Sequence, residues 1–324
     1  MDFDGKNVLI TGGAGFIGST LAIRLVESGA MVTVIDSLIP TYGGNLHNIA
    51  PVRHLVRINI SDVRDPYSME YLVKGQDFLF NLAGQTSHLD SMTAPEIDLE
   101  INARSQLSIL EACRHHNPGI RIVFASTRQI YGVPSYLPVD EAHPIKPVDV
   151  NGINKSAGEQ YHLLYNTIYS IRSTVLRLTN TYGPRMRIRD ARQTFLGIWI
   201  KNALTGQPFE VWGGDQLRDF NYIDDCVDAL LAATADQAVG QIYNLGSREV
   251  ISLARLAALI TDIVPGSTFT IKEFPGENKK IDIGDYYADF GKITKELGWA
   301  PKVSLSDGIS ATCHYYRDCL DKFI

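Results

Sequence analysis

The sequence has few cysteines, no long apolar run and no excess of positive charge. Its four cysteines are far apart or stand at a spacing that matches no metal pattern, so we expect reduced thiols in a cytoplasmic protein and no bound metal. Lys and Arg total 30 against 36 Asp and Glu, a net charge of -6, which disfavours a nucleic-acid groove. The start "MDFDGK" is followed by neither a signal-like stretch nor a membrane-spanning run, so we expect neither secretion nor a membrane partner.

The composition is that of an ordinary globular protein. Hydrophobic residues make up 45% and charged residues 20% of the 324 residues, and we find no internal repeat or low-complexity tract. A chain of this length forms either one large domain or one domain with a smaller lobe.

Short apolar runs bounded by Gly, Asp or Asn recur through the first half and are typical of buried strands. They are "NVLI" from Asn7, "MVTVID" to Asp36, "VRINI" to Ile60, "DFLFNLAG" to Gly84, "RIVFAS" to Ser126 and "STVLRLTN" to Asn180. Segments with helical periodicity alternate with them, which predicts an α/β protein with a doubly wound parallel sheet. We therefore predict a nucleotide-binding domain over residues 1–180 and a smaller mixed α/β lobe over 181–324. A segment at about 222–246 is expected to return to the first domain.

The first predicted strand runs into "TGGAGFIG", which places Gly12, Gly15 and Gly18 at three-residue intervals before a helix. Glycines serve there for a sharp turn, for close approach to a pyrophosphate and for helix packing, while the helix N-terminus binds phosphate. Asp36 ends the second strand at the distance expected of a ribose-binding carboxylate, and it favours NAD over NADP because it would repel the extra phosphate. Asp62 follows the third strand and could contact the adenine or cap the next helix.

Together these residues resemble the extended short-chain dehydrogenase/reductase family, in particular its nucleotide-sugar epimerases, dehydratases and decarboxylases. The resemblance covers nearly the whole chain and rests on the following segments: "TGGAGFIG", "SDVRD", "NLAGQTS", "EINARSQLSILEA", "FASTRQIYG", "VDEAHPIKP", "NKSAGE", "LRLTNTYGPRM", "LRDFNYIDDCVDAL", "YNLGS" and "LGWAPKVSLSDGI". It implies a Rossmann-type fold, NAD as cofactor and a nucleotide diphosphate sugar as substrate. The expected cofactor-binding residues are Gly12, Gly15, Phe16, Ile17, Gly18, Asp36, Ser37, Asp62, Val63, Leu82, Ala83, Gly84 and Lys155.

In that family a Ser or Thr, a Tyr and a Lys surround the sugar and the nicotinamide, with the last two spaced as YxxxK. Matching residue by residue puts Thr127 at the hydroxyl position and Lys155 at the lysine position. The tyrosine position falls on Asn151. An amide can orient a hydroxyl, but it has no proton to exchange near neutral pH.

A second departure follows Thr127. The family's dehydratases carry Asp-Glu there and its decarboxylases carry a Glu, whereas this chain has Arg128 and Gln129. Loss of those carboxylates disfavours both reactions. Arg128 would instead suit an anionic substrate group, or be a surface loop residue.

Three side chains could replace the missing tyrosine in proton transfer. Tyr131 belongs to the "IYG" that the family shares and is normally structural. His88 lies in the loop after the fourth strand and titrates near working pH, although a lone loop histidine is often simply solvated. Lys155 could act as a base if desolvated, or it could only hold the nicotinamide ribose.

The substrate-binding residues are expected mainly in the second half. Asn180 and Arg218 match positions at which the family contacts the diphosphate, and an arginine suits phosphate oxygens. An ion pair of Arg218 with Asp219 or Asp224 is the alternative. Further candidates are Ser87 and Gln193 in the pocket, and Lys279 or Lys280 near a phosphate.

The sequence therefore predicts an NAD-dependent enzyme that acts on a nucleotide diphosphate sugar, with a UDP-sugar favoured, by epimerisation through a transient keto intermediate. A dehydratase or decarboxylase with atypical acid/base residues is one alternative. A catalytically inactive NAD and nucleotide-sugar sensor or partner subunit is the other. By resemblance we expect a homodimer formed through helices at about 95–115 and 151–165. The apolar positions Ile97, Ile101 and Leu110 on the first helix permit this, but would serve equally for packing on the sheet.

Overall fold

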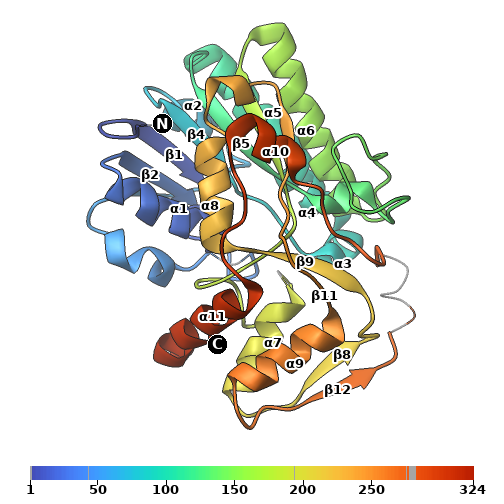
Figure 1. Cartoon of the computed structure of the whole chain (residues 1–324). Helices are drawn as coiled ribbons and strands as arrows, with labels where there is room; N and C mark the ends of the chain where they lie inside the picture. Colours follow the sequence, from blue (N-terminus) through green and yellow to red (C-terminus); the bar gives the residue numbers. More distant parts are fainter. Residues whose placement is uncertain (1, 43, 193, 275, 277–281) are drawn as a thin grey trace.

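A seven-stranded, fully parallel sheet forms the centre of the protein, seen in a computed structural model that describes residues 2–42, 44–192, 194–274, 276 and 282–324 (Figure 1). Its strand order is β10-β6-β5-β4-β1-β2-β3. The strands are β1 (Asn7–Thr11), β2 (Met31–Asp36), β3 (Arg57–Ile60), β4 (Phe78–Asn81), β5 (Arg121–Thr127), β6 (Arg172–Leu178) and β10 (Ile242–Asn244). The predicted Rossmann-type fold is confirmed.

Helices cover both faces of this sheet because its strands alternate their apolar side chains between two clusters. Val8 and Ile10 of β1 belong to one hydrophobic cluster, whereas Leu9 between them belongs to the other. The first cluster is shared with α1 (Phe16–Glu27), α8 (Ile223–Ala232) and α10 (Gly291–Leu297). The second is shared with α2 (Pro66–Leu72), α5 (Ser105–His116) and α6 (Val150–Tyr169).

The chain reverses direction across the sheet between β1 and β4. From β1 it builds outward through β2 and β3, then returns to place β4 on the other side of β1. The hydroxyl of Thr11, at the end of β1, joins the two strand ends by donating to Asn81 Oδ1 at 2.9 Å. Such a reversal leaves a crevice at the carboxyl ends of the strands, where open α/β sheets bind their ligands.

A smaller lobe adds two short sheets, in the lower half of Figure 1. One has the order β11-β9-β7, and the other pairs β12 with β8. These strands are β7 (Asn180–Tyr182), β8 (Phe209–Trp212), β9 (Leu217–Tyr222), β11 (Val250–Ser252) and β12 (Phe269–Lys272), and the helices beside them are α7 (Phe195–Leu204), α9 (Leu253–Ile263) and α11 (Leu305–Cys319).

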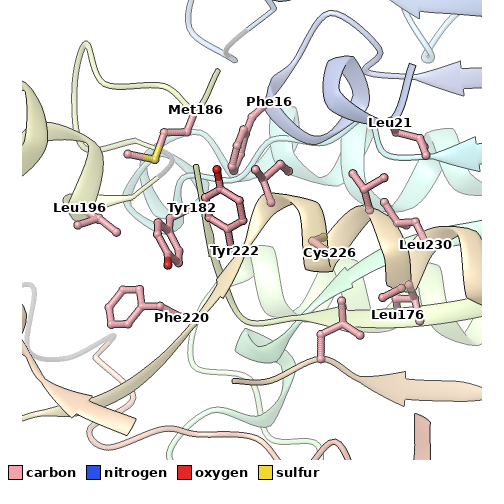
Figure 2. Packing of buried hydrophobic residues seen from close by; sticks show 14 of the residues in the cluster. Phe16, Leu21, Leu176, Tyr182, Met186, Leu196, Phe220, Tyr222, Cys226 and Leu230 are labelled. Carbon is pink, nitrogen blue, oxygen red and sulfur yellow. The ribbon is translucent and has the colours of Figure 1, made fainter. Parts of the chain in front are cut away.

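One hydrophobic cluster joins the lobe to the large sheet. Figure 2 shows Phe16 of α1 and Cys226 of α8 in the same cluster as Tyr182 of β7 and Phe220 of β9. The chain also returns to the large sheet, since β10 pairs with β6. The division of the chain at residue 180 stays a prediction.

The segment before α5 is one interrupted helical run. It comprises α4 (Pro95–Leu99), a π-helical turn over Glu100–Arg104, and then α5. Ile101 and Leu110 are buried, at 6% and 0% exposed, while Ile97 is 42% exposed. Of the three apolar positions named for an interface, only Ile97 is therefore at the surface. Among the described residues, no helix is long and apolar enough to cross a membrane.

Candidate functional site

The first turn of α1 presents free backbone N–H groups to a cavity at the end of β1. Gly15 is the N-cap and provides no side-chain hydrogen bond, so the helix N-terminus is open to an anion. A Cβ at Gly18 would lie 2.3 Å from the carbonyl oxygen of Gly12, and one at Gly12, where φ is +67°, would lie 3.0 Å from Ala83. These glycines are thus required by the close approach of turn, helix and β4.

Twelve of the predicted cofactor residues line this cavity, which we call the cofactor cavity. They are Gly12, Gly15, Phe16, Ile17, Gly18, Asp36, Ser37, Asp62, Val63, Leu82, Ala83 and Gly84. The carboxylate of Asp36 accepts backbone hydrogen bonds from Ala14 at 3.0 Å and Leu38 at 2.9 Å. Burial raises its pKa, against the opposing effect of these two bonds. Each of its oxygens keeps a further lone pair with which to accept a ribose hydroxyl.

Asp62 also lines the cofactor cavity, where it forms a two-pronged ion pair with Arg64 at 2.7 and 3.0 Å. The side-chain hydrogen bond from Arg64 holds the pKa of this carboxyl below its usual value. The alternative that Asp62 caps the next helix is wrong, because Asp65 is the N-cap of α2 and accepts from Tyr67 N at 3.2 Å.

A second cavity, the catalytic cavity, shares Phe16, Ile17, Leu82, Gly84 and Thr86 with the first. Five of the predicted catalytic residues line it: Thr127, Lys155, Asn151, Arg128 and His88. Thr127 Oγ1 accepts from the backbone N–H of Gln129 at 3.2 Å, which leaves its own hydroxyl proton free to be donated into the cavity.

Lys155 is buried at the end of β5. Its Nζ donates to the carbonyl of Ala125 at 3.1 Å and lies 5.1 Å from the centre of the Phe124 ring. Burial lowers the pKa of Lys155 to about 8, although Asp98 and Glu159 act in the opposite direction. A Cβ at Gly84 would lie 3.0 Å from Nζ, so a glycine there leaves room for this lysine.

Asn151 is held by a buried polar network. Its amide nitrogen donates to the carbonyl of Gln85 at 2.8 Å and to Asp98 Oδ2 at 3.1 Å, and Asn154 donates to Asp98 Oδ1 at 2.8 Å. With the nitrogen engaged in this way, the amide oxygen is the atom of Asn151 left to meet a ligand. That oxygen can accept a hydrogen bond but cannot exchange a proton.

His88 is the first residue of α3 (His88–Thr93), and its side chain is 37% exposed. Its Nδ1 lies 2.9 Å from Oδ2 of the fully buried Asp149, although the ring N–H is not well aligned with that oxygen. Asp149 is the N-cap of α6 and also accepts from Gly152 N at 2.7 Å and from Gln129 Nε2 at 2.9 Å. Burial raises the pKa of Asp149, but His88 and these two donors outweigh it and bring the pKa below its usual value.

Gln129 and Tyr131 lie away from the cavities. Gln129 is 4% exposed and turned toward Asp149. The hydroxyl of Tyr131 donates to Asn244 at 2.6 Å and accepts from Arg177 at 2.7 Å, and burial raises its pKa to about 12. A direct catalytic role of either side chain therefore finds no support.

Arg128 and Asn180 lie where the catalytic cavity meets a third one, and both line each of the two. Arg128 donates to Asn180 Oδ1 at 2.8 Å, and its guanidinium lies 5.2 Å from the centre of the Tyr286 ring. Its other terminal nitrogen, Nη1, is buried without a hydrogen-bond partner among the described residues. Burial lowers the pKa of Arg128, and the surface-loop alternative is wrong.

The third cavity, of about 650 Å³, lies between α7, β8 and β9 and is called the nucleotide cavity below. Its lining includes Ser87 and Arg218, and also aromatic side chains, namely Phe195, Trp199, Phe209, Trp212 and Phe274. Arg218 donates to Asp282 at 3.2 Å and to the carbonyl of Gly284, so its ion pair is not with Asp219 or Asp224. Burial lowers the pKa of Arg218 to about 10. The candidates Gln193, Lys279 and Lys280 lie outside the described residues.

The profile of the NAD-dependent epimerase/dehydratase family matches residues 8–246. The chain belongs to this family. A Methanocaldococcus jannaschii protein named "Putative UDP-glucose 4-epimerase" is 34% identical over 96% of this chain and 98% of its own length. UDP-glucuronic acid decarboxylase 1 of Xenopus tropicalis is 33% identical, over 98% of this chain and 74% of its own. The crystal structure of Thermotoga maritima UDP-glucose 4-epimerase with UDP-glucose superposes with a TM-score of 0.88 at 29% identity, covering 97% of this chain and 99% of that one.

NAD, the cofactor of this epimerase/dehydratase family, fits the residues present. Backbone N–H groups at the start of α1 suit its pyrophosphate, and Asp36 suits a ribose diol. The Nζ of Lys155 lies where the cofactor and catalytic cavities join at Gly84. When bound, NAD supplies an acceptor and donor of hydride.

Several site residues were not predicted from the sequence. Tyr42 and Ile39 line the cofactor cavity from the loop after β2, and Asp98 and Asp149 lie behind Asn151 and His88. The segment "IKPVDVNG" could have indicated Asp149 as a helix N-cap, since Asp is a preferred N-cap residue. No local pattern indicates that it faces His88.

Proposed function

We propose that this protein converts a nucleotide diphosphate sugar, most simply a UDP-sugar, by NAD-dependent epimerisation at a carbinol carbon through a keto intermediate. The observation that carries the proposal is that the three cavities adjoin one another. The cofactor and catalytic cavities share five residues, and the catalytic and nucleotide cavities share His88, Arg128, Asn180 and Thr194. A cofactor, a sugar and a nucleotide can therefore occupy adjoining cavities.

The side chains along these cavities suit each part of such a substrate. Thr127 can donate to a sugar hydroxyl, and Asn151 can accept from another. Arg128, Asn180 and Arg218 suit the diphosphate, since buried guanidinium groups form paired hydrogen bonds with phosphate oxygens. The aromatic lining suits the base, and about 650 Å³ falls in the usual range for small-molecule sites.

Epimerisation is favoured over dehydration and decarboxylation by the catalytic cavity. Among its described lining residues there is no carboxylate, and Arg128 and Gln129 follow Thr127 where the dehydratases and decarboxylases carry acids. Epimerisation needs the fewest acid or base groups beyond those of oxidation. Epimerisation is also the reaction in the names of the Methanocaldococcus relative and of the Thermotoga enzyme.

The test is an assay of the purified protein with NAD in heavy water against UDP-, dTDP-, CDP- and GDP-sugars, read by mass spectrometry and proton NMR. We expect inversion at one carbon of at least one UDP-sugar, with no change in mass beyond exchange of its hydroxyl protons, because the hydride that leaves the carbon is the one that returns to it. Loss of water or of carbon dioxide would identify a dehydratase or a decarboxylase instead. Saturable binding with no conversion would support the inactive sensor, for which Asn151 is the specific observation.

We also propose a domain division, a cellular location and an oligomeric state for the protein. Residues 1–180 would bind NAD and 181–324 the nucleotide sugar, with α8 and β10 returning to the first domain. The protein would work in the cytoplasm, which suits its free cysteines. A homodimer would form through α5 and α6, whose outer sides carry the exposed Leu107, Ile153, Leu164 and Ile168.

A further inference from the structure

His88 stands where the sugar and the nucleotide would meet. Its imidazole lines both the catalytic and the nucleotide cavity, and its Nδ1 side faces Asp149. The opposite nitrogen, Nε2, is therefore the one available to a ligand. An imidazole with one nitrogen toward a buried carboxylate and the other toward a cavity has the arrangement of an oriented general base.

Asp149 is built to remain a carboxylate. It is 2% exposed, and Gly152 N donates to one oxygen while Gln129 Nε2 donates to the other, beside which His88 Nδ1 lies at 2.9 Å. An anionic acceptor at Nδ1 keeps the proton of a neutral imidazole there and leaves Nε2 free to accept. The imperfect alignment of the ring is common in ligand-free sites, where catalytic hydrogen bonds tighten on binding.

The other ionisable side chains near His88 and Asp149 are less suited to act as the general base. Among the described residues lining the catalytic cavity, only His88, Arg128 and Lys155 carry a basic side chain, and no carboxylate is present. Arginine does not release its proton in proteins. Lys155 is 6% exposed and donates to Ala125 O, so its Nζ is directed to the end of β5. At the rim, Asp90 is paired with Arg192 at 2.9 Å.

We propose that His88, oriented by Asp149, transfers the proton that the missing tyrosine would have moved; this proposal rests on the proposed epimerase function. The O–H bond of the sugar carbinol breaks and its proton passes to Nε2. The electron pair of that bond would form the carbonyl while hydride leaves the carbon, for which NAD, when bound, would be the acceptor. On return of hydride to the carbonyl carbon, Nε2 gives the proton back to the oxygen, so the protein ends unchanged.

The same arrangement explains Gln129. Its amide donates to Asp149 at 2.9 Å, whereas a glutamate at this position would place a second negative charge beside that carboxylate. Gln129 and Asp149 are thus positioning residues that act through His88, and of these three residues only His88 would contact the reacting group.

The test compares wild type with His88→Asn, Asp149→Asn and, as a matched control, His116→Asn on the outer end of α5. Asn can replace Asp as a helix N-cap, so Asp149→Asn should keep the fold, which melting temperature verifies. We expect His88→Asn to lower kcat on the active nucleotide sugar by roughly 10²- to 10⁴-fold, with the dissociation constants for NAD and UDP within about threefold of wild type. The control should keep wild-type kcat.

A second readout does not depend on turnover. Nitrogen-15 NMR of histidine-labelled protein, with the His88 signal assigned by its loss in His88→Asn, reports which ring nitrogen carries the proton. We expect Nδ1–H in wild type and a shift toward Nε2–H in Asp149→Asn.

The outcomes separate the two proposals. An active wild type with a His88→Asn variant within about threefold in kcat overturns the role of His88 and leaves the proposed function standing. An unchanged tautomer in Asp149→Asn overturns the orienting role of Asp149. A wild type that binds but converts no nucleotide sugar overturns the proposed function, and the proton transfer with it.

Discussion

Among the described residues that line the cofactor and catalytic cavities, Lys155 is the only lysine. The carboxylate that attracts it most strongly, Asp98, is fully buried and already accepts from Asn151 and Asn154. The ammonium therefore faces a negative charge that is partly satisfied by amides, and desolvation outweighs the attraction. This balance is what brings the pKa of Lys155 to about 8.

A consequence for stability follows from the lowered pKa of Lys155. Between pH 8 and the ordinary value of 10.5, the unfolded chain binds more protons at this position than the folded protein, so stability rises with pH. The gain should approach roughly 3 kcal/mol at the upper end of that window. We expect the free energy of unfolding of wild type, measured by urea denaturation from pH 7.5 to 9.5, to increase relative to that of Lys155→Met.

The exposed Lys74 supplies the control for Lys155. The difference in unfolding free energy between wild type and Lys74→Met should stay flat over the same pH range. A flat difference for Lys155→Met as well would show that the ammonium is not desolvated as described.

Single residues can be predicted from the sequence where their roles depend on the geometry of one short segment. Gly12, Gly15, Gly18 and Asp36 could be predicted because a strand, a turn and a helix determine their positions within one short segment. The pairing of His88 with Asp149 could not, because it depends on where α3 and the start of α6 meet in space.

The contact of α6 with β6 depends on a buried ion pair. Arg177 of β6 donates through two nitrogens to Glu159 of α6, at 3.0 and 2.7 Å, and both side chains are nearly inaccessible to water. Ser126 at the end of β5 also donates to Glu159. Because Glu159 lies one turn after Lys155 on α6, this pair helps to place the lysine against the end of β5.

Removal of one partner should be costly. Arg177→Met leaves the carboxylate of Glu159 buried without its cation, and we expect a loss of about 3–5 kcal/mol in the free energy of unfolding. Replacing both, as Arg177→Met with Glu159→Leu, should recover much of that loss, because no uncompensated charge remains. Urea denaturation of the single and double variants measures both effects.

The matched control for this ion pair is Arg172→Met, at an exposed position of the same strand. Its effect should stay below about 1 kcal/mol. If Arg177→Met were equally mild, the ion pair would not stabilise the contact between α6 and β6.

Elements of the large sheet were the easiest to predict. Their strands are buried on both faces, so "MVTVID" and "RIVFAS" stand out as apolar runs, and β2 and β5 occupy them. The predicted strand "STVLRLTN" divides, since β6 ends at Leu178 and β7 begins at Asn180 in another sheet. β8 and β12 were not predicted, because strands of four residues in a small sheet leave a weak alternation of apolar residues.

Together, the three cavities are lined by residues from both the large sheet and the smaller lobe. Thr127 and Lys155 come from the sheet and its helix α6, whereas Arg218 comes from β9 of the lobe and Phe209 from β8. Sequence matching could name individual residues on both sides, but which of them share a cavity depends on how the lobe packs against the sheet. Their common hydrophobic cluster fixes that packing (Figure 2).

The outer sides of α5 and α6 carry exposed apolar side chains. Leu107 and Leu164 are 38% and 53% exposed on adjacent helices, and an apolar surface of this kind is typical of a subunit interface. We expect the wild type to sediment at about twice the chain mass of 35.9 kDa, and Leu107→Glu with Leu164→Glu to sediment as a monomer, because buried unpaired carboxylates oppose association. Ile271→Glu on β12, at a position 56% exposed, is the control that should remain a dimer. A monomeric wild type, or a double variant that still dimerises, would rule out this interface.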